Sequence, residues 1–412
     1  MERPLTIAHT SDWHLGLRQF DARSRTGRNL REQDIGRAAS AVASAIADSD
    51  ADIVIHAGDV YEAPVVALRW QVLFQQMLVR MSRRPDGRLR PVIVISGNHD
   101  QPSDMREPAA INLDSVVPGA HIVTSGYSRV HLGDHYDDPA YRNVVIHAIP
   151  HDALRTVDWE TVTCVDGAVN ILTSHGVVGG SDLYKRSKHR EFPIPTPVLA
   201  QPWDYVAMGH WHKRGPVPVG AHTARTTPVW YCGSPENNDF GEAIAPDGAA
   251  GRGWLEVEVT GGGAPPKVTG HDLPIRPMLT LPDIDAAGMA ADDITAAMVA
   301  AVSDPALADA VVRQRIVGVT RDEWHLVDVD AARKAASATC WYEIVRIAAT
   351  SVDDPDAEAP DTYTSLTSAL DAAIGELCDD DTDPAAALAS ELLGAALATV
   401  GTEKAGDTPD ET

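Results

Sequence analysis

The sequence predicts an α/β protein built as a layered α/β/β/α sandwich, with two central sheets and helices on the outer faces. Two patterns predict this class. The first hundred residues alternate short β-branched runs with helical stretches, which favours a sheet with helices packed on it. Between 144 and 260, strand-like runs follow one another with few helices between them, which is typical of a second sheet.

The first sheet is predicted from three strands and two helices in alternation. LTIAH (5–9), DIVIHAGD (52–59) and PVIVISGNHD (91–100) are rich in β-branched residues, as strands buried on both faces usually are. Between these strands, apolar residues recur at helical spacing over 28–48 and 66–82.

The second sheet is predicted from five further runs, separated by residues that favour turns. These runs are VVIHAIP (144–150), VNILTSHG (169–176), DYVAMGHWH (204–212), PVWYCGSPE (228–236) and GWLEVEVT (253–260).

Two segments divide the chain into parts. TGGGAPPK (260–267) is a Gly/Pro-rich linker, so we expect the sandwich domain to occupy 1–265. Residues 273–350 contain a helical stretch near 292–302 and strand-like runs, and they are predicted to form a small α/β capping domain. A second boundary is expected in the acidic segment 351–361.

The remaining segment, 351–412, is predicted to be an acidic tail with two short helices. Apolar residues recur there at helical spacing, and Asp383 followed by Pro384 is a typical helix start. Such stripes fit docking on a partner helix. The alternative is a disordered end rich in alanine and aspartate, and we favour docking helices embedded in disorder.

The net charge of −25 is unevenly distributed along the chain. The last 62 residues carry one basic residue, Lys404, against 16 acidic residues. Residues 1–270 hold 26 basic against 31 acidic residues, and several of these acids are candidate metal ligands. Because the acidity belongs mainly to the tail, the overall charge does not exclude a nucleic-acid substrate.

Neither a membrane span nor a disulfide framework is predicted. The chain has no apolar run of 18 residues, and its N-terminus has no apolar signal region, so we expect a cytoplasmic protein. The four cysteines form no CxxC pair, which predicts free buried thiols rather than a zinc ribbon. They are Cys164, Cys232, Cys340 and Cys378.

Five short motifs carry candidate metal ligands, and each directly follows a strand-like run. Side chains at the carboxyl ends of neighbouring strands converge on one crevice. Gly58, Gly97 and Gly209 would let the backbone turn sharply there and bring the ligands close to a phosphate. The motifs are Asp12-Trp13-His14, Gly58-Asp59, Gly97-Asn98-His99-Asp100, Ser174-His175-Gly176 and Gly209-His210-Trp211-His212.

These residue types suit a two-metal phosphoesterase. Two divalent cations about 4 Å apart can hold both the attacking and the leaving oxygen of a displacement at phosphorus. Asp59 is the natural carboxylate to bridge them. Mixed nitrogen and oxygen ligands favour manganese, iron or zinc over calcium. If Asn98 binds metal, its neighbour His99 is free to act on the leaving oxygen.

The motifs resemble those of the calcineurin-like metallophosphoesterases, and the residues around them resemble the SbcD-type nuclease subunits of double-strand-break repair. The resemblance covers 1–260 well and 273–350 only in outline. The matching stretches are HTSDWHLG (9–16), HAGDVYEAP (56–64), ISGNHD (95–100), MGHWHK (208–213) and YCGSPENNDFGE (231–242).

The resemblance implies a specific site. One metal ion would be held by Asp12, His14, Asp59 and His212, and the second by Asp59, Asn98, His175 and His210. His99 would contact the scissile phosphate and assist departure of the leaving oxygen.

It also implies an activity and partners. The activity would be manganese-dependent exonuclease and endonuclease action on DNA ends and hairpins, in DNA repair and recombination. The partner would be an SbcC-like ATPase with a long coiled coil, and the nuclease would be a homodimer within a heterotetramer.

Two other functions remain open. One is a stand-alone phosphodiesterase for nucleotides or other small phosphodiesters, which the segment 273–350 disfavours because small substrates do not require a second domain. The other is a scaffold that binds DNA ends with a dispensable site. Complete sets of ligands argue against such an inert site.

Other residues beside the motifs are predicted to be structural. His9 and His56 would lie in the core or behind the ligands, His147 and His151 would be surface or structural residues, Asp100 would orient a histidine or cap a turn, and Trp13 and Trp211 would pack around the site rather than stack on a base.

Two basic segments beside the motifs fit DNA contact or a solvated loop equally well, and a third is predicted to be a surface turn at a helix end. The first two are Arg18, Arg23, Arg25, Arg28 and Arg31, and Lys185, Arg186, Lys188 and Arg190; the third is Arg83, Arg84, Arg88 and Arg90.

Overall fold

A computed structural model of the chain describes residues 3–20, 23, 27–102, 109–179, 181, 192–242, 251–337 and 339–348. The chain divides into two compact units, 1–348 and 349–412, and every described residue belongs to the first. The expected helices of the tail, Cys378 and the basic cluster 185–190 therefore lie outside the described residues.

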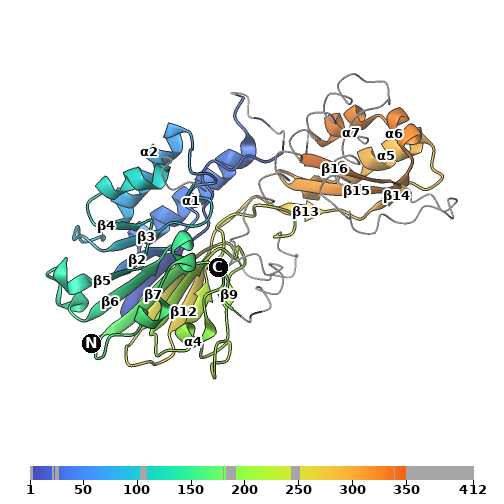
Figure 1. Cartoon of the computed structure of the whole chain (residues 1–412). Coiled ribbons are helices and arrows are strands. Elements are labelled where there is room, and N and C mark those ends of the chain that lie inside the picture. The colour runs from blue at the N-terminus through green and yellow to red at the C-terminus, as the bar shows by residue number, and fades with distance from the viewer. Residues whose placement is uncertain are drawn as a thin grey trace, which may run out of the picture. The chain divides into compact units, whose positions relative to one another are not determined.

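The first sheet has six strands in the order β12-β11-β1-β2-β3-β4 (Figure 1). Strands β1 to β4 run parallel, and β11 and β12 extend the sheet antiparallel at the β1 edge. The strands are β1 Leu5–Thr10, β2 Ile53–His56, β3 Val92–Ile95, β4 Ala120–Val123, β11 Gly253–Val259 and β12 Lys267–Asp272.

Helices α1 (Leu30–Asp48) and α2 (Leu68–Met81) cover the outer face of this sheet, as Figure 1 shows. Asn29 caps α1 by accepting a hydrogen bond from the backbone of Glu32. Apolar residues at helical spacing, such as Val42 and Phe74, pack onto the strands and form the outer core. Both helices begin and end within two residues of the predicted stretches.

The second sheet has the order β5-β6-β7-β8-β10-β9, with β6, β7, β8 and β10 parallel. It packs face to face on the first sheet through a core that includes Ile7, Ile55 and Ile171. Its other face is covered by the short helix α4 (Thr196–Leu199) and by 3-10 turns. The strands are β5 Ser128–His131, β6 Val144–Ile149, β7 Val169–His175, β8 Tyr205–Gly209, β9 Gly215–Pro216 and β10 Val229–Tyr231.

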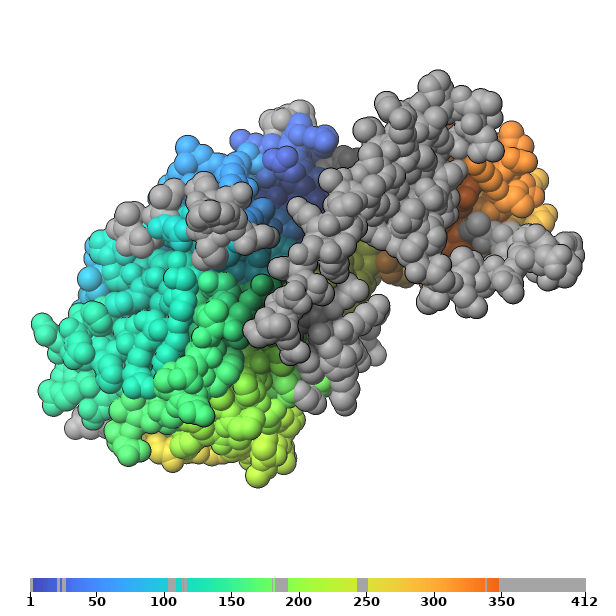
Figure 2. Space-filling model, in the orientation of Figure 1, coloured from blue at the N-terminus to red at the C-terminus, as the bar shows by residue number. Residues whose placement is uncertain are grey.

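The predicted α/β/β/α sandwich is thus confirmed, with a thin outer layer on the second sheet. The 3-10 turns of the described chain are Ala110–Val116, Leu132–Asp134, Pro139–Tyr141, His151–Arg155, Trp159–Thr161 and Pro305–Leu307. In the space-filling view of Figure 2, the early part of the chain, in blue, lies above the middle part, in teal and green, on the face shown.

The sheet predicted for one strand is wrong. The run 253–260 forms β11, which pairs with β1 in the first sheet. Its side chains alternate between the two cores, with Trp254 under the helices and Leu255 between the sheets. The Gly/Pro-rich segment 260–267 is the connection of the β11–β12 hairpin, so the first sheet continues past 265 to Asp272.

A separate α/β segment with its own core follows from Met278. Strand β15 is central, with β13 and β14 along one edge and β16 along the other, all parallel to it. The elements are β13 Met278–Thr280, β14 Ile284–Asp285, α5 Ala291–Val302, β15 Val311–Val319, α6 Arg321–Leu326, α7 Val329–Ala336 and β16 Trp341–Ala348. The predicted helix and strands of this segment are present.

Arg90 shows that the third basic group is not simply a surface turn. Its side chain is fully buried, and its guanidinium donates to carbonyl groups at the ends of α1 and α2, including those of Ile46 and Met81. Arg84 pairs with buried Asp52 at 2.9 Å. The predicted interaction with helix ends is therefore present, but in the interior of the protein.

Among the described residues, no helix is long and apolar enough to cross a membrane. In the same part of the chain, Cys232 and Cys340 are buried free thiols and Cys164 is a partly buried one.

Candidate metal centre

The predicted ligands lie where parallel strands of both sheets end. Asp12 and His14 follow β1, Asp59 follows β2, and His175 and His212 end or follow β7 and β8. Because β1, β2 and β3 are parallel, and β7 and β8 are parallel too, the five motifs meet at one edge of the sandwich.

The first predicted ligand set forms a compact group. One donor atom from each of Asp12, His14, Asp59 and His212 lies within 4.8 Å of all the others. The Nε2 atoms of His14 and His212 are 3.0 Å apart. Asp59 Oδ2 lies 3.6 Å from His14 Nε2, and Asp12 Oδ1 lies 3.8 Å from His212 Nε2.

The second predicted set adjoins the first through Asp59. The Oδ2 atom of Asp59 lies 3.3 Å from Nε2 of His175. The Oδ1 atom of Asn98 lies 3.0 Å from His175 Nε2 and 3.0 Å from His210 Nδ1. All seven predicted metal ligands are therefore brought together, with Asp59 between the two groups.

The chemistry of these atoms fits divalent cations. Asp12 Oδ2 is buried and has no hydrogen-bond partner among the described residues. At 3.0 Å, the Nε2 atoms of His14 and His212 place two metal-binding nitrogens almost in contact. A cation among them would satisfy the carboxylate and both imidazoles at once. The residues present fit two cations sharing one carboxylate.

Three histidines are oriented by partners on their Nδ1 atoms. His14 Nδ1 lies 2.9 Å from a carboxylate oxygen of Glu62, and His212 Nδ1 lies 2.5 Å from one of Glu242. His175 Nδ1 donates to the carbonyl of Ala57 at 2.8 Å. Since these partners only accept, each ring keeps a proton on Nδ1, and Nε2 is the atom that is free to bind a cation.

The electrostatics of the centre favour positive charge. Burial would lower the pKa of His14, but the Glu62 hydrogen bond and the charges of Asp59 and Asp12 raise it to about 9. Burial is likewise outweighed at His175, where Asp59 raises the pKa to about 9. The imidazoles in turn hold the pKa of Asp59 well below its usual value, against the effect of its burial. Cations binding here would replace protons on these rings.

His99 lies beside these groups but differs from them in its contacts. Its side chain is 39% exposed, its ring is 4.8 Å from that of His14, and its Nδ1 donates to the carbonyl of Glu62 at 2.9 Å. The backbone N–H of His99 donates to Asp59 Oδ1 at 2.9 Å. Nδ1 is thus engaged by the carbonyl of Glu62, and the catalytic role of His99 stays a prediction.

The motif glycines are required for a reason other than the predicted approach to phosphate. A Cβ atom at Gly97 would lie 2.0 Å from Asp59 Oδ1, and one at Gly209 would lie 1.9 Å from the Ala57 carbonyl. At Gly58, which has a positive φ of 92°, a Cβ would lie 2.4 Å from His175 Nδ1. These glycines let the ligand loops pack against one another.

Most of the neighbouring residues are structural, as predicted. Trp13 is 1% exposed and packs on His56 and Phe74, so it cannot stack on a base. Asp100 caps the ligand turns by accepting backbone N–H groups of Gly97, Val60 and Tyr61. Burial and the charge of Asp59 raise the pKa of Asp100 to about 6.

The buried histidines have distinct surroundings. Burial lowers the pKa of both His9 and His56 to about 3, and His9 Nδ1 is bonded to Tyr205 at 2.8 Å. His147 is buried and bonded to Tyr127, so its predicted surface alternative is wrong. His151 stacks on His210 with ring centroids 6.1 Å apart, directly at the edge of the centre.

Sequence reasoning missed the residues behind the ligands. Glu242 accepts from His212 and from the backbone of Asn238, and the guanidinium of Arg252 donates to the carbonyls of Glu242 and His212. Glu242 ends the stretch YCGSPENNDFGE, which the sequence marked by its resemblance alone. The signal that could have identified Glu242 was its place in this matching stretch, although the stretch lies far along the chain from most of the predicted ligands.

Comparison with known proteins agrees with this geometry. Residues 5–243 match the family described as calcineurin-like phosphoesterase. The chain is also similar to the SbcD subunit of the nuclease SbcCD from Bacillus subtilis (strain 168), with 28% identity over 276 residues. That similarity covers 58% of this chain and 63% of the relative, so the chain spans less than two thirds of the relative's length.

Proposed function

Since the chain belongs to the calcineurin-like phosphoesterase family, we propose that this metallophosphoesterase is an SbcD-type nuclease that hydrolyses phosphodiester bonds at DNA ends and hairpins. The observation that carries the proposal is the double ligand group around Asp59. The similarity to a nuclease subunit favours DNA as the substrate over small phosphodiesters.

In this proposal, the two ligand groups hold two cations, most suitably Mn²⁺. Asp12, His14, Asp59 and His212 would hold one, and Asp59, Asn98, His175 and His210 the other. Bound cations would supply an activated water and a positive field for the phosphate.

The chain's own residues complete the chemistry. The Nδ1–H of His99 is held by the carbonyl of Glu62, so a protonated ring has its transferable proton on Nε2. That atom would give the proton to the leaving oxygen. Because Glu62 also holds His14, one residue fixes both the acid and a ligand.

The partners are part of the same proposal. We expect an SbcC-like coiled-coil ATPase to bind the chain, and the nuclease to be a dimer within that assembly. Residues 1–265 would form the nuclease domain, 273–350 a capping and DNA-binding domain, and 351–412 a tail that binds the ATPase. The first sheet continues to Asp272, which moves the end of the nuclease domain there.

Cleavage of DNA and of a small ester separates the proposed function from its alternatives. The protein with Mn²⁺ is given hairpin DNA, blunt-ended DNA and bis-p-nitrophenyl phosphate, with and without the ATPase. We expect all three to be cleaved, and His99→Ala to lower the rate on DNA about 100-fold or more. Exposed His131 provides the control variant His131→Ala. Hydrolysis of the ester with no cleavage of DNA under any condition would disprove the nuclease proposal.

A further inference from the structure

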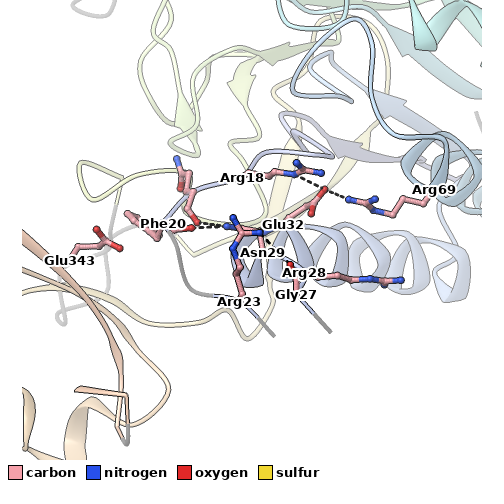
Figure 3. A pocket seen from close by; sticks show the side chains of 10 residues that line it. Arg18, Phe20, Arg23, Gly27, Arg28, Asn29, Glu32, Arg69 and Glu343 are labelled. Carbon is pink, nitrogen blue, oxygen red and sulfur yellow. Dashed lines mark hydrogen bonds and ion pairs between the residues drawn. The ribbon is translucent and has the colours of Figure 1, made fainter. Parts of the chain in front are cut away.

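An arginine-rich pocket lies beside the start of α1 (Figure 3). It has a volume of about 500 Å³, within the range of pockets that bind small molecules. Four arginines line it against two carboxylates, Glu32 and Glu343. The pocket therefore has an excess of positive charge, and the arginines are Arg18, Arg23, Arg28 and Arg69.

The arginine heads are arranged around one buried carboxylate. Arg18 and Arg69 both pair with Glu32, whose side chain is 4% exposed, while Arg18 itself is 64% exposed. Arg23 and Arg28 are exposed on the same loop. A single carboxylate cannot neutralise the two guanidinium groups that share it, so this side of the pocket attracts anions.

The described residues Gln19 and Phe20 are held in place by Asn29. The side-chain amide of Asn29 donates to the carbonyls of Gln19 and Phe20, at 2.9 and 2.7 Å. The Oδ1 atom of the same residue caps α1. Figure 3 shows these bonds joining the loop to the helix start. One side chain thus fixes the position of the pocket's wall.

Phe20 adds an aromatic surface in an unusual conformation. Its φ is 55°, a backbone region that bulky residues rarely adopt, and its ring is only partly buried against Phe240, with the centroids 5.5 Å apart. Such strain is retained where the surrounding structure and function require it. Here it places a half-exposed ring on the wall of a cationic pocket.

The pocket continues towards the metal centre. A neighbouring cavity of about 320 Å³ shares Arg18 and Glu32 with it, and is also lined by Glu62. The carboxylate of Glu62 lies 2.9 Å from His14 and 3.8 Å from His99. Glu62 thus lines a cavity shared with Arg18, and it contacts both His14 and the predicted catalytic residue His99.

Not every basic residue of the segment takes part. Arg31 is fully buried and bonded to Asp34 and to the carbonyl of Asn237, so it cannot reach a ligand. Arg25 lies outside the described residues. Among its described residues, this basic segment therefore contains three accessible arginines, Arg18, Arg23 and Arg28, and one structural arginine, Arg31.

We propose that this arginine pocket, formed by Arg18, Phe20, Arg23, Arg28 and Asn29, binds the nucleotides that adjoin the scissile bond. The guanidinium groups would contact the phosphates, and the ring of Phe20 would stack on a base. Phosphate contacts and aromatic stacking are the two means by which proteins hold single-stranded nucleic acid without reading its sequence. The proposal rests on the nuclease function and adds the residues that hold the polymer.

Binding and cleavage test the pocket separately. Affinity for a fluorescent hairpin with a single-stranded end is measured by anisotropy over a range of salt concentrations, for wild type, Arg23→Gln/Arg28→Gln and Phe20→Leu. The double variant should lose about tenfold or more in affinity, and its slope of log K against log salt should fall by about 1.4 to 1.8. Phe20→Leu should lose about fivefold or more with an unchanged salt slope.

Hydrolysis of bis-p-nitrophenyl phosphate serves as the check on folding, because this ester needs the metal centre but no neighbouring nucleotide. Each variant should retain hydrolysis of this ester, which shows that its metal centre is folded. Arg88→Gln is the matched control, since Arg88 is exposed on the turn before β3, at the opposite end of the strand from Asn98. Its affinity should equal that of wild type.

Each outcome has a defined meaning. If the two pocket variants bind DNA as tightly as Arg88→Gln, the pocket is not the binding site, even if the protein cleaves DNA. If they lose affinity while wild type binds but never cleaves DNA, the pocket stands and the nuclease function fails. Absence of DNA binding by wild type overturns both. Displacement of the hairpin by inorganic phosphate at equal concentration would show a site for free anions instead of a nucleotide chain.

Discussion

At the scale of single residues, the predicted ligands are held in strained backbone conformations. Six non-glycine residues of the described chain have a positive φ, and four of them are Asp12, His14, Asp59 and His210. Each costs on the order of 1 kcal/mol relative to an ordinary conformation. The turns after β1, β2 and β8 therefore hold the donor atoms ready before any cation binds.

Replacing Gly97 by alanine should disable the centre without unfolding the protein. The new Cβ would lie 2.0 Å from Asp59 Oδ1, so the shared carboxylate must move. We expect ester hydrolysis to fall about 100-fold or more. Gly215→Ala is the control, because none of the described residues lies within 4 Å of a Cβ there. Normal activity of Gly97→Ala with unchanged circular dichroism would contradict this account.

Glu242→Gln should weaken metal binding more than it changes the reaction. Glu242 fixes the ring of His212, and loss of such a partner typically lowers metal affinity 10- to 100-fold. Isothermal titration calorimetry with Mn²⁺ measures the effect, and kcat at saturating Mn²⁺ should stay near that of wild type. Glu258→Gln removes a partly exposed carboxylate that pairs with Lys267, and its Mn²⁺ affinity should not change.

Asp114→Asn should stabilise the protein above neutral pH. Burial raises the pKa of Asp114 to about 6, with Tyr61 as its hydrogen-bond donor. A raised acid is most favourable when protonated, so wild type loses this contribution as the pH rises from about 4 through 6. Urea denaturation at pH 5 and pH 8 should show an advantage for asparagine that is about 1 kcal/mol larger at pH 8 than at pH 5. An equal difference at both pH values would argue against it.

Sequence order and residue type were enough to predict the seven ligands and His99, because each stands at or just after the end of a strand and offers a suitable donor. The residues behind them were not predicted. Glu62 and Glu242 lie in stretches that the sequence marked only by resemblance, and their role follows only from the 2.9 and 2.5 Å approaches to His14 and His212. Donor type can be read from the local sequence, whereas these approaches depend on tertiary packing.

At the scale of elements, strand and helix positions followed from periodicity, but pairing did not. The segment 253–260 was recognised as a strand, yet nothing in its alternation distinguishes a place beside β1 from a place in the second sheet. The pairing of β11 with β1 depends instead on the path of the chain after β10, which returns to the side of β1 that β2 does not occupy. Likewise, the buried state of Arg90 depends on two helix ends that meet only in the fold.

Arg90→Gln should destabilise the fold strongly. The substitution leaves the buried carbonyls of Ala51 and Met81 without their donor and removes one of the donors to Ile46, so we expect a loss of about 3 kcal/mol in the free energy of unfolding. Urea denaturation measures it. Arg88→Gln, on the exposed part of the same turn, should cost less than about 0.5 kcal/mol. Equal stability of the two variants would show that the buried guanidinium is dispensable.

At the scale of the whole molecule, the centre joins the two sheets. Asp12, Asp59 and Asn98 follow strands of the first sheet, while His175 and His212 belong to the second. The sheets also meet through apolar side chains such as Ile55 and Ile171 and through the buried hydrogen bond between His9 and Tyr205. A cation held by both sets would therefore act as a cross-link between the layers.

Chelation should accordingly lower the stability of the whole sandwich. A ligand present at 100 times its dissociation constant stabilises the native state by about 2.7 kcal/mol. We expect the midpoint of thermal unfolding to fall by several degrees when EDTA removes Mn²⁺. Asp59→Asn should show a much smaller response to Mn²⁺. Identical midpoints for wild type with and without Mn²⁺ would contradict the cross-link.

The distance along the chain between His14 and His212 also determines when the full set of donor groups becomes available during translation. The two residues are 198 positions apart, so at 5–20 residues per second a ribosome needs about 10 to 40 s to deliver the second after the first. For most of that interval the nascent chain displays only the half of the centre that follows β1, β2 and β3, because His175 precedes His212 by just 37 positions. A partial set of donors discriminates poorly among cations, so the identity of the metal would be decided after translation has passed β8, by the free metal pool that the finished sandwich then meets.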